Sequence, residues 1–195
     1  KAVMFDLDDT LYYELDYVKE AFGSVAEYLG TKYSLPAETI LHSCMQILPT
    51  EGRGRIFNRV CEQYGMQEEI GHLLQIYRAT KPRLQLYPEA VSLLRQLRDH
   101  SIRTGVITDG IAMVQRAKTE ALFPGRMPDA VLLTDEVRDA DGRSLSKPDP
   151  QVYLLCLQQL GAGPQEAVYV GDNPGKDFIG ARHLGIKTVR VIHAQ

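Results

Sequence analysis

The chain opens with an apolar segment that leads directly into two carboxylates. Ala2–Phe5 has the composition of a short buried strand, and it continues as Asp-Leu-Asp-Asp-Thr, which places Asp6 and Asp8 two residues apart. Residues with this spacing in an extended segment point to the same side, so the two carboxylates can share one site. Like charges this close are tolerated when a cation lies between them or when one group binds a proton. Because open α/β sheets bind ligands at the carboxyl ends of their strands, the segment predicts an α/β fold with a metal-dependent site.

Acidic residues after a strand are also common in turns and at helix N-termini, so the pair alone leaves both readings open. Two later segments carry polar residues at similar places. Thr108 and Asp109 follow an apolar run, and a threonine there can donate to a phosphate oxygen or bind its own backbone. Lys147 precedes Asp149, a helix cap followed by proline, and its ammonium can reach an anion or remain in solvent.

A further segment follows the apolar run Ala167–Val170 and reads Gly-Asp-Asn-Pro-Gly-Lys-Asp. It places Asp172 at the carboxyl end of a predicted strand and Asp177 nearby. Asn173 before proline is typical of a helix cap, which is the simpler interpretation of that residue. The acidic residues nevertheless add to the site predicted at the first strand.

These four segments, in this order and each following an apolar strand, resemble the haloacid dehalogenase (HAD) superfamily of phosphohydrolases over essentially the whole chain. The resemblance implies that Asp6 is the nucleophile and Asp8 the general acid/base. It implies that the substrate phosphate is bound by Thr108, Asp109 and Lys147, and that magnesium (Mg2+) is bound by Asp6, the Asp8 carbonyl and Asp172. The implied supporting residues are Thr10, Asn173 and Asp177. The implied activity is hydrolysis of a small-molecule phosphate monoester through an aspartyl-phosphate.

The residue at position 8 separates the branches of this family. Dehalogenases lack the second carboxylate because a halide leaves without a proton, whereas this chain has Asp8. Phosphoglucomutase relatives keep both carboxylates but typically continue Asp-Gly-Val, whereas this chain continues Asp9-Thr10-Leu11. A phosphatase is therefore favoured over a phosphosugar mutase or a dehalogenase. A binding module that lost catalysis is disfavoured because the residue set is intact.

Composition is that of a globular protein and adds no specificity to the predicted function. A chain of 195 residues can bury the core of one catalytic domain with a modest insertion. A net charge of −3 gives no support for binding to nucleic acid or to an anionic membrane. The 3 cysteines are widely spaced, which fits reduced thiols in a cytosol. No segment is apolar enough to span a bilayer and no signal peptide is visible, so we expect a cytoplasmic protein.

Hydrophobic spacing divides the chain into a core and a helical insertion. Helical periodicity covers the part from Glu14 to about Leu84, with helices expected at Leu15–Leu29, Pro36–Leu48, Arg55–Tyr64 and Gln67–Arg78. This insertion resembles the helical cap that subfamily I of the HAD family carries between its first two motifs. We therefore expect a Rossmann-like catalytic core of residues 1–13 and 85–195 and a cap of residues 14–84.

After the insertion, helices and strands alternate. Strands are expected at Ile102–Ile107, Ala130–Leu133, Ala167–Val170 and Thr188–Ile192. Helices are expected at Pro88–His100, Ile111–Leu122, Pro150–Leu160 and Lys176–Leu184. With the first strand this makes a parallel sheet of about five strands. Asp141-Gly142 predicts a turn or a small hairpin.

One arginine in the insertion is a candidate for substrate recognition. Arg53 lies between Gly52 and Gly54, and glycine permits close approach while arginine binds carboxylates and phosphates in a bidentate manner. A surface loop with a solvated arginine explains the same residues equally well. By resemblance, substrates would be acylneuraminate phosphates, other sugar phosphates or nucleotides.

Overall fold

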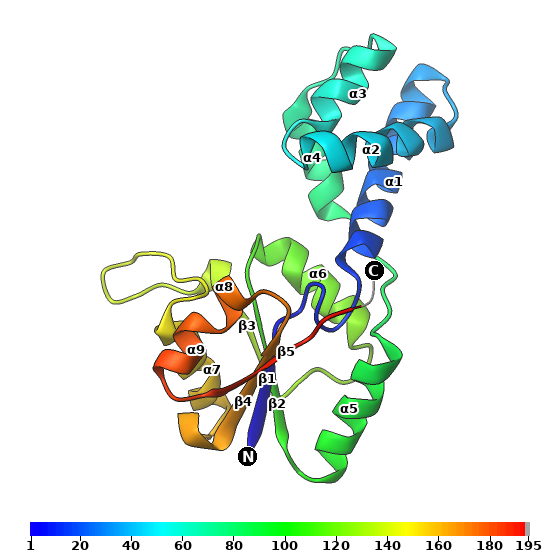
Figure 1. Ribbon diagram of the computed structural model, residues 1–195. Coiled ribbons are helices and arrows are strands. Elements are labelled where there is room, and N and C mark those ends of the chain that lie inside the picture. The colour runs from blue at the N-terminus through cyan, green and yellow to red at the C-terminus, as the bar shows by residue number, and fades with distance from the viewer. Residues whose placement is uncertain (194–195) are drawn as a thin grey trace. The chain divides into compact units, whose positions relative to one another are not determined.

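A computed structural model describes residues 1–193. The chain divides into two compact units, one formed by Lys1–Glu14 together with the chain from Leu84 onward, and the other by Leu15–Arg83. The first unit contains the sheet and the second is helical (Figure 1).

The first unit is built on a five-stranded parallel sheet with the strand order β3-β2-β1-β4-β5. Its strands are β1 (Ala2–Phe5), β2 (Arg103–Thr108), β3 (Ala130–Leu133), β4 (Ala167–Gly171) and β5 (Lys187–Arg190). The first strand lies at the centre, where Phe5 is opposite Val106 on one side and Val170 on the other. The residues that follow β1, β2 and β4 therefore emerge side by side at one edge of the sheet.

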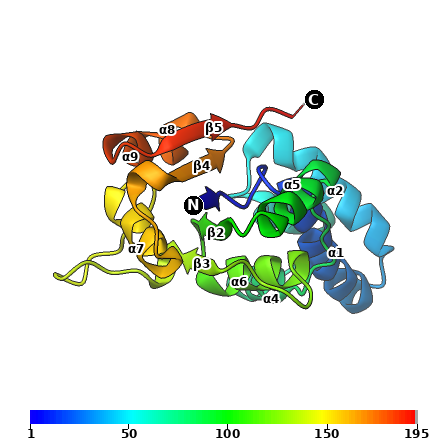
Figure 2. The ribbon, with the colours of Figure 1, turned by 90° about the horizontal axis from the view of Figure 1, so that it is seen from below.

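Helices cover both faces of this sheet, as Figure 2 shows. The helices of the first unit are α5 (Pro88–Asp99), α6 (Ala112–Leu122), α7 (Pro150–Leu160), α8 (Pro174–Asp177) and α9 (Ile179–His183), with short 3-10 turns η1 (Thr134–Glu136) and η2 (Pro164–Glu166). Helices α7 and α9 pack on one face, and α5 and α6 lie on the other. The alternating pattern after residue 84 correctly predicts this layered α/β core.

The main core cluster lies between the sheet and α7. Tyr153 and Tyr169 are completely buried and meet edge to face, with ring centroids 5.0 Å apart. Gly105 allows α7 to approach β2 closely, because a Cβ added there would lie 2.8 Å from the Cys156 sulfur. A strand residue without a side chain is thus used for close helix packing.

The prediction of one continuous helix over Lys176–Leu184 is wrong in one respect, since the structure divides this segment into α8 and α9 at Phe178. The Tyr153 hydroxyl lies 3.0 Å from the carbonyl oxygens of both Lys176 and Asp177 and binds the backbone where the helix breaks. A Cβ at Gly180 would lie 2.0 Å from the Pro148 carbonyl oxygen, so the chain passes very close to the segment that contains Lys147. Tertiary contacts therefore override the local helical pattern.

The Asp141-Gly142 turn is present as predicted. Arg138 and Ser144 form an isolated antiparallel bridge, and the Asp139 amide donates to the Arg143 carbonyl at 2.9 Å. Gly142 has a φ of 80°, a backbone conformation that favours glycine.

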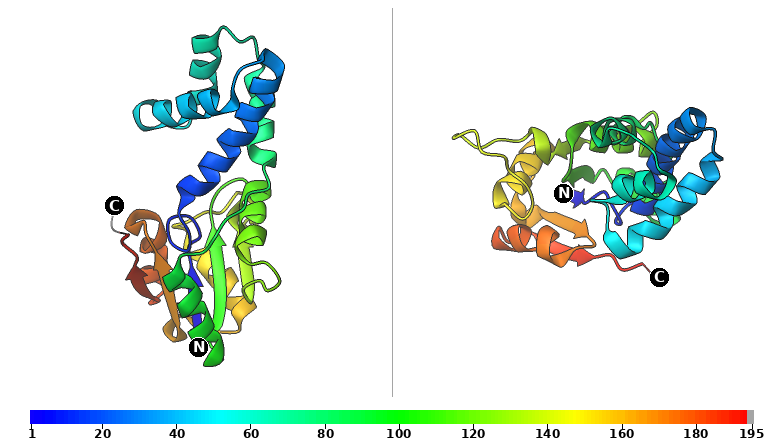
Figure 3. Two further views of the ribbon diagram at one scale, coloured as in Figure 1. Left: turned by 90° about the vertical axis from the view of Figure 1, so that its right-hand side faces the viewer. Right: turned by 90° about the horizontal axis from the view of Figure 1, so that it is seen from above.

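The second unit contains four helices, α1 (Glu14–Tyr33), α2 (Ala37–Glu51), α3 (Ile56–Tyr64) and α4 (Ile70–Ala79), which Figure 3 shows from two sides. Its core includes Phe22, Phe57 and Tyr77, whose rings lie 5.5–6.0 Å apart in tilted and edge-to-face arrangements. All four helices were expected from the spacing of apolar residues, with boundaries that differ by a few residues.

None of the helices within residues 1–193 is long and apolar enough to cross a membrane. Cys44, Cys61 and Cys156 are unpaired and buried.

Candidate active site

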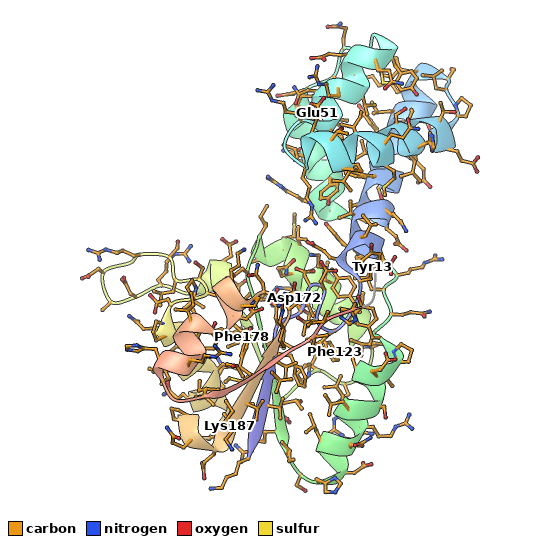
Figure 4. The ribbon with its side chains drawn as sticks, viewed as in Figure 1. Tyr13, Glu51, Phe123, Asp172, Phe178 and Lys187 are labelled. Atoms are coloured by element: carbon orange, nitrogen blue, oxygen red, sulfur yellow. The ribbon has the colours of Figure 1, made fainter. Side chains whose placement is uncertain are left out.

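Three of the predicted site residues meet where neighbouring parallel strands end. Asp6 follows β1, Thr108 is the last residue of β2, and Asp172 follows β4. The Asp6 amide donates to the Val170 carbonyl at 2.9 Å, which holds the chain in register one residue beyond β1. Figure 4 shows Asp172 at this edge of the sheet. The strand order therefore brings together residues that are far apart in the sequence.

Three carboxylates form an acidic cluster at this edge. Asp6, Asp172 and Asp177 each offer an oxygen, and these oxygens lie within 4.8 Å of one another. Burial raises the pKa of Asp6 to about 7, although the neighbouring Lys147 ammonium acts in the opposite direction. Burial, followed by the charge of Asp177, also raises the pKa of Asp172. The resemblance assigned Asp177 a supporting role, whereas the geometry makes it a full member of the cluster.

Asp177 reaches the cluster because the end of β4 has no side chain. A Cβ added at Gly171 would lie 2.3 Å from Oδ2 of Asp177, a distance that no real pair of atoms tolerates. The Asn173 amide donates to the same oxygen at 2.9 Å. The backbone of this turn thus fixes one carboxylate oxygen and leaves the other for the site.

Lys147 is buried and supplies a positive charge to the cluster. Its ammonium donates to Asp6, and to Oδ1 of Asp177 at 2.9 Å. Burial lowers the pKa of Lys147, but the two carboxylates outweigh this effect and hold it above its usual value. The Asp109 carboxylate accepts from the Lys147 amide at 3.2 Å and from the Thr134 hydroxyl at 2.8 Å. Asp109, predicted to bind substrate, therefore also ties the lysine backbone to the end of β2.

Asp8 has a separate set of partners. Its Oδ1 accepts from the Tyr12 hydroxyl at 2.5 Å and from the Lys118 ammonium at 2.8 Å. Its Oδ2 accepts from the Gln115 side-chain amide at 2.8 Å, and the same amide donates to the Thr108 hydroxyl. Burial and the charge of Asp8 raise the pKa of Tyr12, so this phenol remains a donor. Sequence reasoning did not identify Gln115 or Lys118 as site residues.

The turn after β1 gives Asp8 its position. Asp9 has a φ of 53°, and its carboxylate accepts from the Glu14 amide at 2.9 Å. The Leu11 amide donates to the Leu7 carbonyl at 3.0 Å, which closes the turn. Thr10 is buried, and its hydroxyl has no hydrogen-bond partner among the residues the structure describes. Its predicted supporting role remains a prediction.

The remaining predicted site residues are Asn173 and Arg53. The Asn173 side chain caps α8 by accepting from the Gly175 amide at 3.2 Å, so the simpler helix-cap interpretation is correct for its side chain. Arg53 is exposed and belongs to the helical unit, between the end of α2 and the start of α3. Its role in substrate recognition remains a prediction.

The sequence matches the family model of haloacid dehalogenase-like hydrolases over residues 3–191. The chain belongs to this family. As a HAD-like hydrolase it also has curated relatives that cover nearly its whole length. The glyceraldehyde 3-phosphate phosphatase of Methanopyrus kandleri is 30% identical, with 98% of this chain and 83% of the relative covered. The phosphoserine phosphatase of Thermus thermophilus is 29% identical, with 98% and 88% covered.

Solved structures of HAD-like proteins have the same fold. The HAD phosphatase of Thermococcus onnurineus is 27% identical and has a TM-score of 0.61, with 98% of this chain and 86% of that chain covered. The 2-haloacid dehalogenase of Pseudomonas syringae has a TM-score of 0.60 at 24% identity, with 97% and 85% covered, which shows the shared fold alone. The α/β core predicted from the sequence is therefore confirmed.

Proposed function

We propose that this HAD-like hydrolase is a magnesium-dependent phosphatase that hydrolyses small-molecule phosphate monoesters through an aspartyl-phosphate, an acyl phosphate formed on Asp6. The observation that carries the proposal is the difference between the two carboxylates that follow β1. Asp6 lies in a buried cluster with Lys147, whereas three donors hold the partly exposed Asp8. Two carboxylates with different surroundings suit the two roles that phosphate hydrolysis requires.

In the first step, an oxygen of Asp6 attacks phosphorus, and the bond from phosphorus to the leaving oxygen breaks. Asp8 gives its proton to that oxygen. In the second step, water attacks phosphorus and gives a proton to Asp8, while the bond from phosphorus to Asp6 breaks. Lys147 and the Thr108 hydroxyl stabilise the phosphoryl oxygens as charge spreads over them.

The acidic cluster fits a hard divalent cation, since its donors are carboxylate oxygens close to one another. Asp6 and Asp172, with the Asp8 carbonyl, would hold Mg2+, and Asp177 would support them. Bound Mg2+ would offset the negative charge of the phosphate and of the attacking carboxylate.

The surroundings of Asp8 also favour a phosphatase over a dehalogenase. Release of a halide needs no proton, so a dehalogenase has no use for an acid/base carboxylate at this place. Here the carboxylate is present and each of its oxygens is bound by a donor. The names of the phosphatase relatives agree with this choice.

We further propose that the helical unit is a cap that selects the leaving group, with Arg53 as a contact for an anionic substrate, and that the enzyme acts in the cytoplasm. The three buried thiols support a reducing compartment.

Phosphate release from a panel of esters tests the proposed function. The panel contains an aryl phosphate, sugar phosphates, acylneuraminate phosphates and nucleotides, together with glyceraldehyde 3-phosphate and phosphoserine. Turnover is expected with Mg2+ and should be lost after chelation, and Asp6→Asn should abolish it while the protein remains folded. No release from any ester in the presence of Mg2+, or near-normal activity of Asp6→Asn without deamidation, would refute the proposal.

A further inference from the structure

The polar face of α6 holds the Asp8 carboxyl group, and this arrangement extends the proposed phosphatase function, on which the inference rests. Gln115 and Lys118 are three residues apart and therefore lie on the same side of the helix. Both donate to the Asp8 carboxylate, Gln115 to Oδ2 and Lys118 to Oδ1. We propose that Gln115 and Lys118 are positioning residues that orient Asp8 for proton transfer, with Oδ2 as the oxygen that carries the proton.

The number of donors on each oxygen identifies Oδ2. Oδ1 accepts from both Tyr12 and Lys118, at 2.5 and 2.8 Å. Among the residues that the structure describes, Oδ2 accepts from Gln115 alone. A carboxylate oxygen has about two acceptor positions, so Oδ1 is saturated and Oδ2 retains one. A proton on its way to or from the leaving oxygen can occupy that position.

Gln115 also determines which hydrogen bond the Thr108 hydroxyl can donate. The side-chain amide of Gln115 has two hydrogens, and it donates one to Asp8 and one to the Thr108 oxygen. A carboxylate can only accept, so the nitrogen of Gln115 must face Asp8. Because the Thr108 oxygen already accepts this bond, its own hydrogen is available for a phosphate oxygen. One side chain thus orients the acid/base group and a phosphate donor together.

The burial of Gln115 and Lys118 indicates that their contacts with Asp8 are specific. Gln115 is 2% exposed, and the side chain of Lys118 is 4% exposed. Burying an amide and an ammonium is costly unless they are well paired, and an apolar side chain would pack this face at lower cost. A purely structural alternative is that Lys118 only offsets the charges of Asp8 and of Glu14, whose carboxylate lies 3.8 Å away. The two alternatives predict different dependence on the leaving group.

Gln115→Met tests the proposal, because methionine has a similar length and no donor. Two substrates are compared. One is a phosphate ester of an aliphatic alcohol that the unmodified enzyme hydrolyses, and the other is 2,4-dinitrophenyl phosphate, whose leaving group departs without a proton. For the aliphatic ester, kcat/KM should fall roughly 10- to 100-fold, the range seen when a supporting hydrogen bond is lost. For the dinitrophenyl ester, kcat/KM should change less than about threefold, since protonation contributes little to that step.

A rapid-mixing experiment gives a second measurement. Asp8 is also needed to activate water in the second step, so Gln115→Met should release dinitrophenolate in a burst of about one equivalent per active site, followed by slow turnover. Lys118→Met should show the same pattern, and Lys118→Arg should restore much of the activity. Arg116→Met is the matched control, because Arg116 is an exposed neighbour on α6 that pairs with Glu136 at 2.5 Å.

Equal losses on both esters, or no loss on either, would overturn the positioning role while leaving the phosphatase function in place. Absence of turnover by the unmodified enzyme on both esters would instead refute the phosphatase function itself. If Lys118→Met does not fold, Gln115→Met decides the question, with its thermal midpoint compared with that of Arg116→Met.

Discussion

Replacement of Gly171 by alanine should disrupt the active site through one defined clash. The added Cβ would lie 2.3 Å from Oδ2 and 2.5 Å from Cγ of Asp177, where ordinary contacts begin near 3.4 Å. Gly171 does not have a positive φ, so alanine suits its backbone and the clash is the only penalty. The Asp177 carboxylate must therefore move by about an ångström.

The cost follows from the contacts that this movement breaks. The carboxylate accepts from the Asn173 amide and from the Lys147 ammonium, both at 2.9 Å. Loss of one hydrogen bond to a charged group costs about 1.5–3 kcal/mol, and overpacking adds about 1–3 kcal/mol. We expect the free energy of unfolding to fall by roughly 2.5–6 kcal/mol in total, which lowers the thermal midpoint of a chain of this size by roughly 5–24 °C.

Urea unfolding in metal-free buffer and phosphate release with Mg2+ are the two assays. Gly175→Ala is the matched control in the same turn, because its added Cβ would lie 3.5 Å from Asn173, an ordinary contact. Its unfolding free energy should stay within about 0.5 kcal/mol of that of the unmodified protein. Gly171→Ala should also lose activity, since Lys147 loses a fixed partner.

A double-mutant cycle with Asp177→Gly separates the clash from other effects of alanine at position 171. Glycine is needed at position 177 because even the Asp177 Cβ would lie 2.8 Å from the added atom. In that background the cost of Gly171→Ala should largely disappear. Persistence of the cost in that background, or a Gly171→Ala variant as stable as the unmodified protein, would show that the clash with Asp177 does not occur.

Three further predictions concern the metal, the thiols and the substrate. Asp172→Ala should raise sharply the Mg2+ concentration needed for activity or abolish activity, and a magnesium titration indistinguishable from that of the unmodified enzyme would contradict this. Burial raises the pKa of Cys44 and of Cys156 to about 12, so both should react with a thiol reagent near neutral pH only after denaturation, and rapid labelling of either in the native protein would be inconsistent with that burial. Arg53→Ala should lower kcat/KM for an anionic substrate by roughly 1.5–3 kcal/mol, or one to two decades, and spare a neutral aryl phosphate, whereas equal effects would exclude Arg53 from recognition.

The meeting of Asp6, Thr108 and Asp172 was predictable from the sequence. Each follows or ends an apolar strand, and the carboxyl ends of parallel strands share one edge of a sheet. The break at Phe178 was not predictable, because it depends on Tyr153, a residue 25 positions earlier in the chain, whose hydroxyl binds the backbone there. Local sequence patterns indicate interactions between residues that are close in the chain, and they do not indicate a contact between residues this far apart.

The contribution of α6 was missed because its buried face combines polar side chains with the apolar Val114 and Leu122. Periodicity predicts that apolar residues face the core, yet Ile111 at its start is 41% exposed and Met113 is 53% exposed. Gln115 and Lys118, which look like solvent-facing residues, are 2% and 3% exposed. A helix that buries an amide and an ammonium beside its apolar residues breaks the usual pattern, and such exceptions occur mainly at functional sites. A polar i, i+3 pair after the second strand was therefore the available signal.

The structure also changes the reason for expecting a metal. The spacing of Asp6 and Asp8, two residues apart, predicts a cation between them or a proton on one of them. Instead each has its own ammonium group, Lys147 for Asp6 and Lys118 for Asp8, so this pair alone does not require a metal. Support for a metal comes instead from Asp172 and Asp177, because with Asp6 they form a cluster of three carboxylates beside the Lys147 ammonium. The proposed metal dependence should therefore respond to substitution of Asp172 far more than to substitution of Asp8.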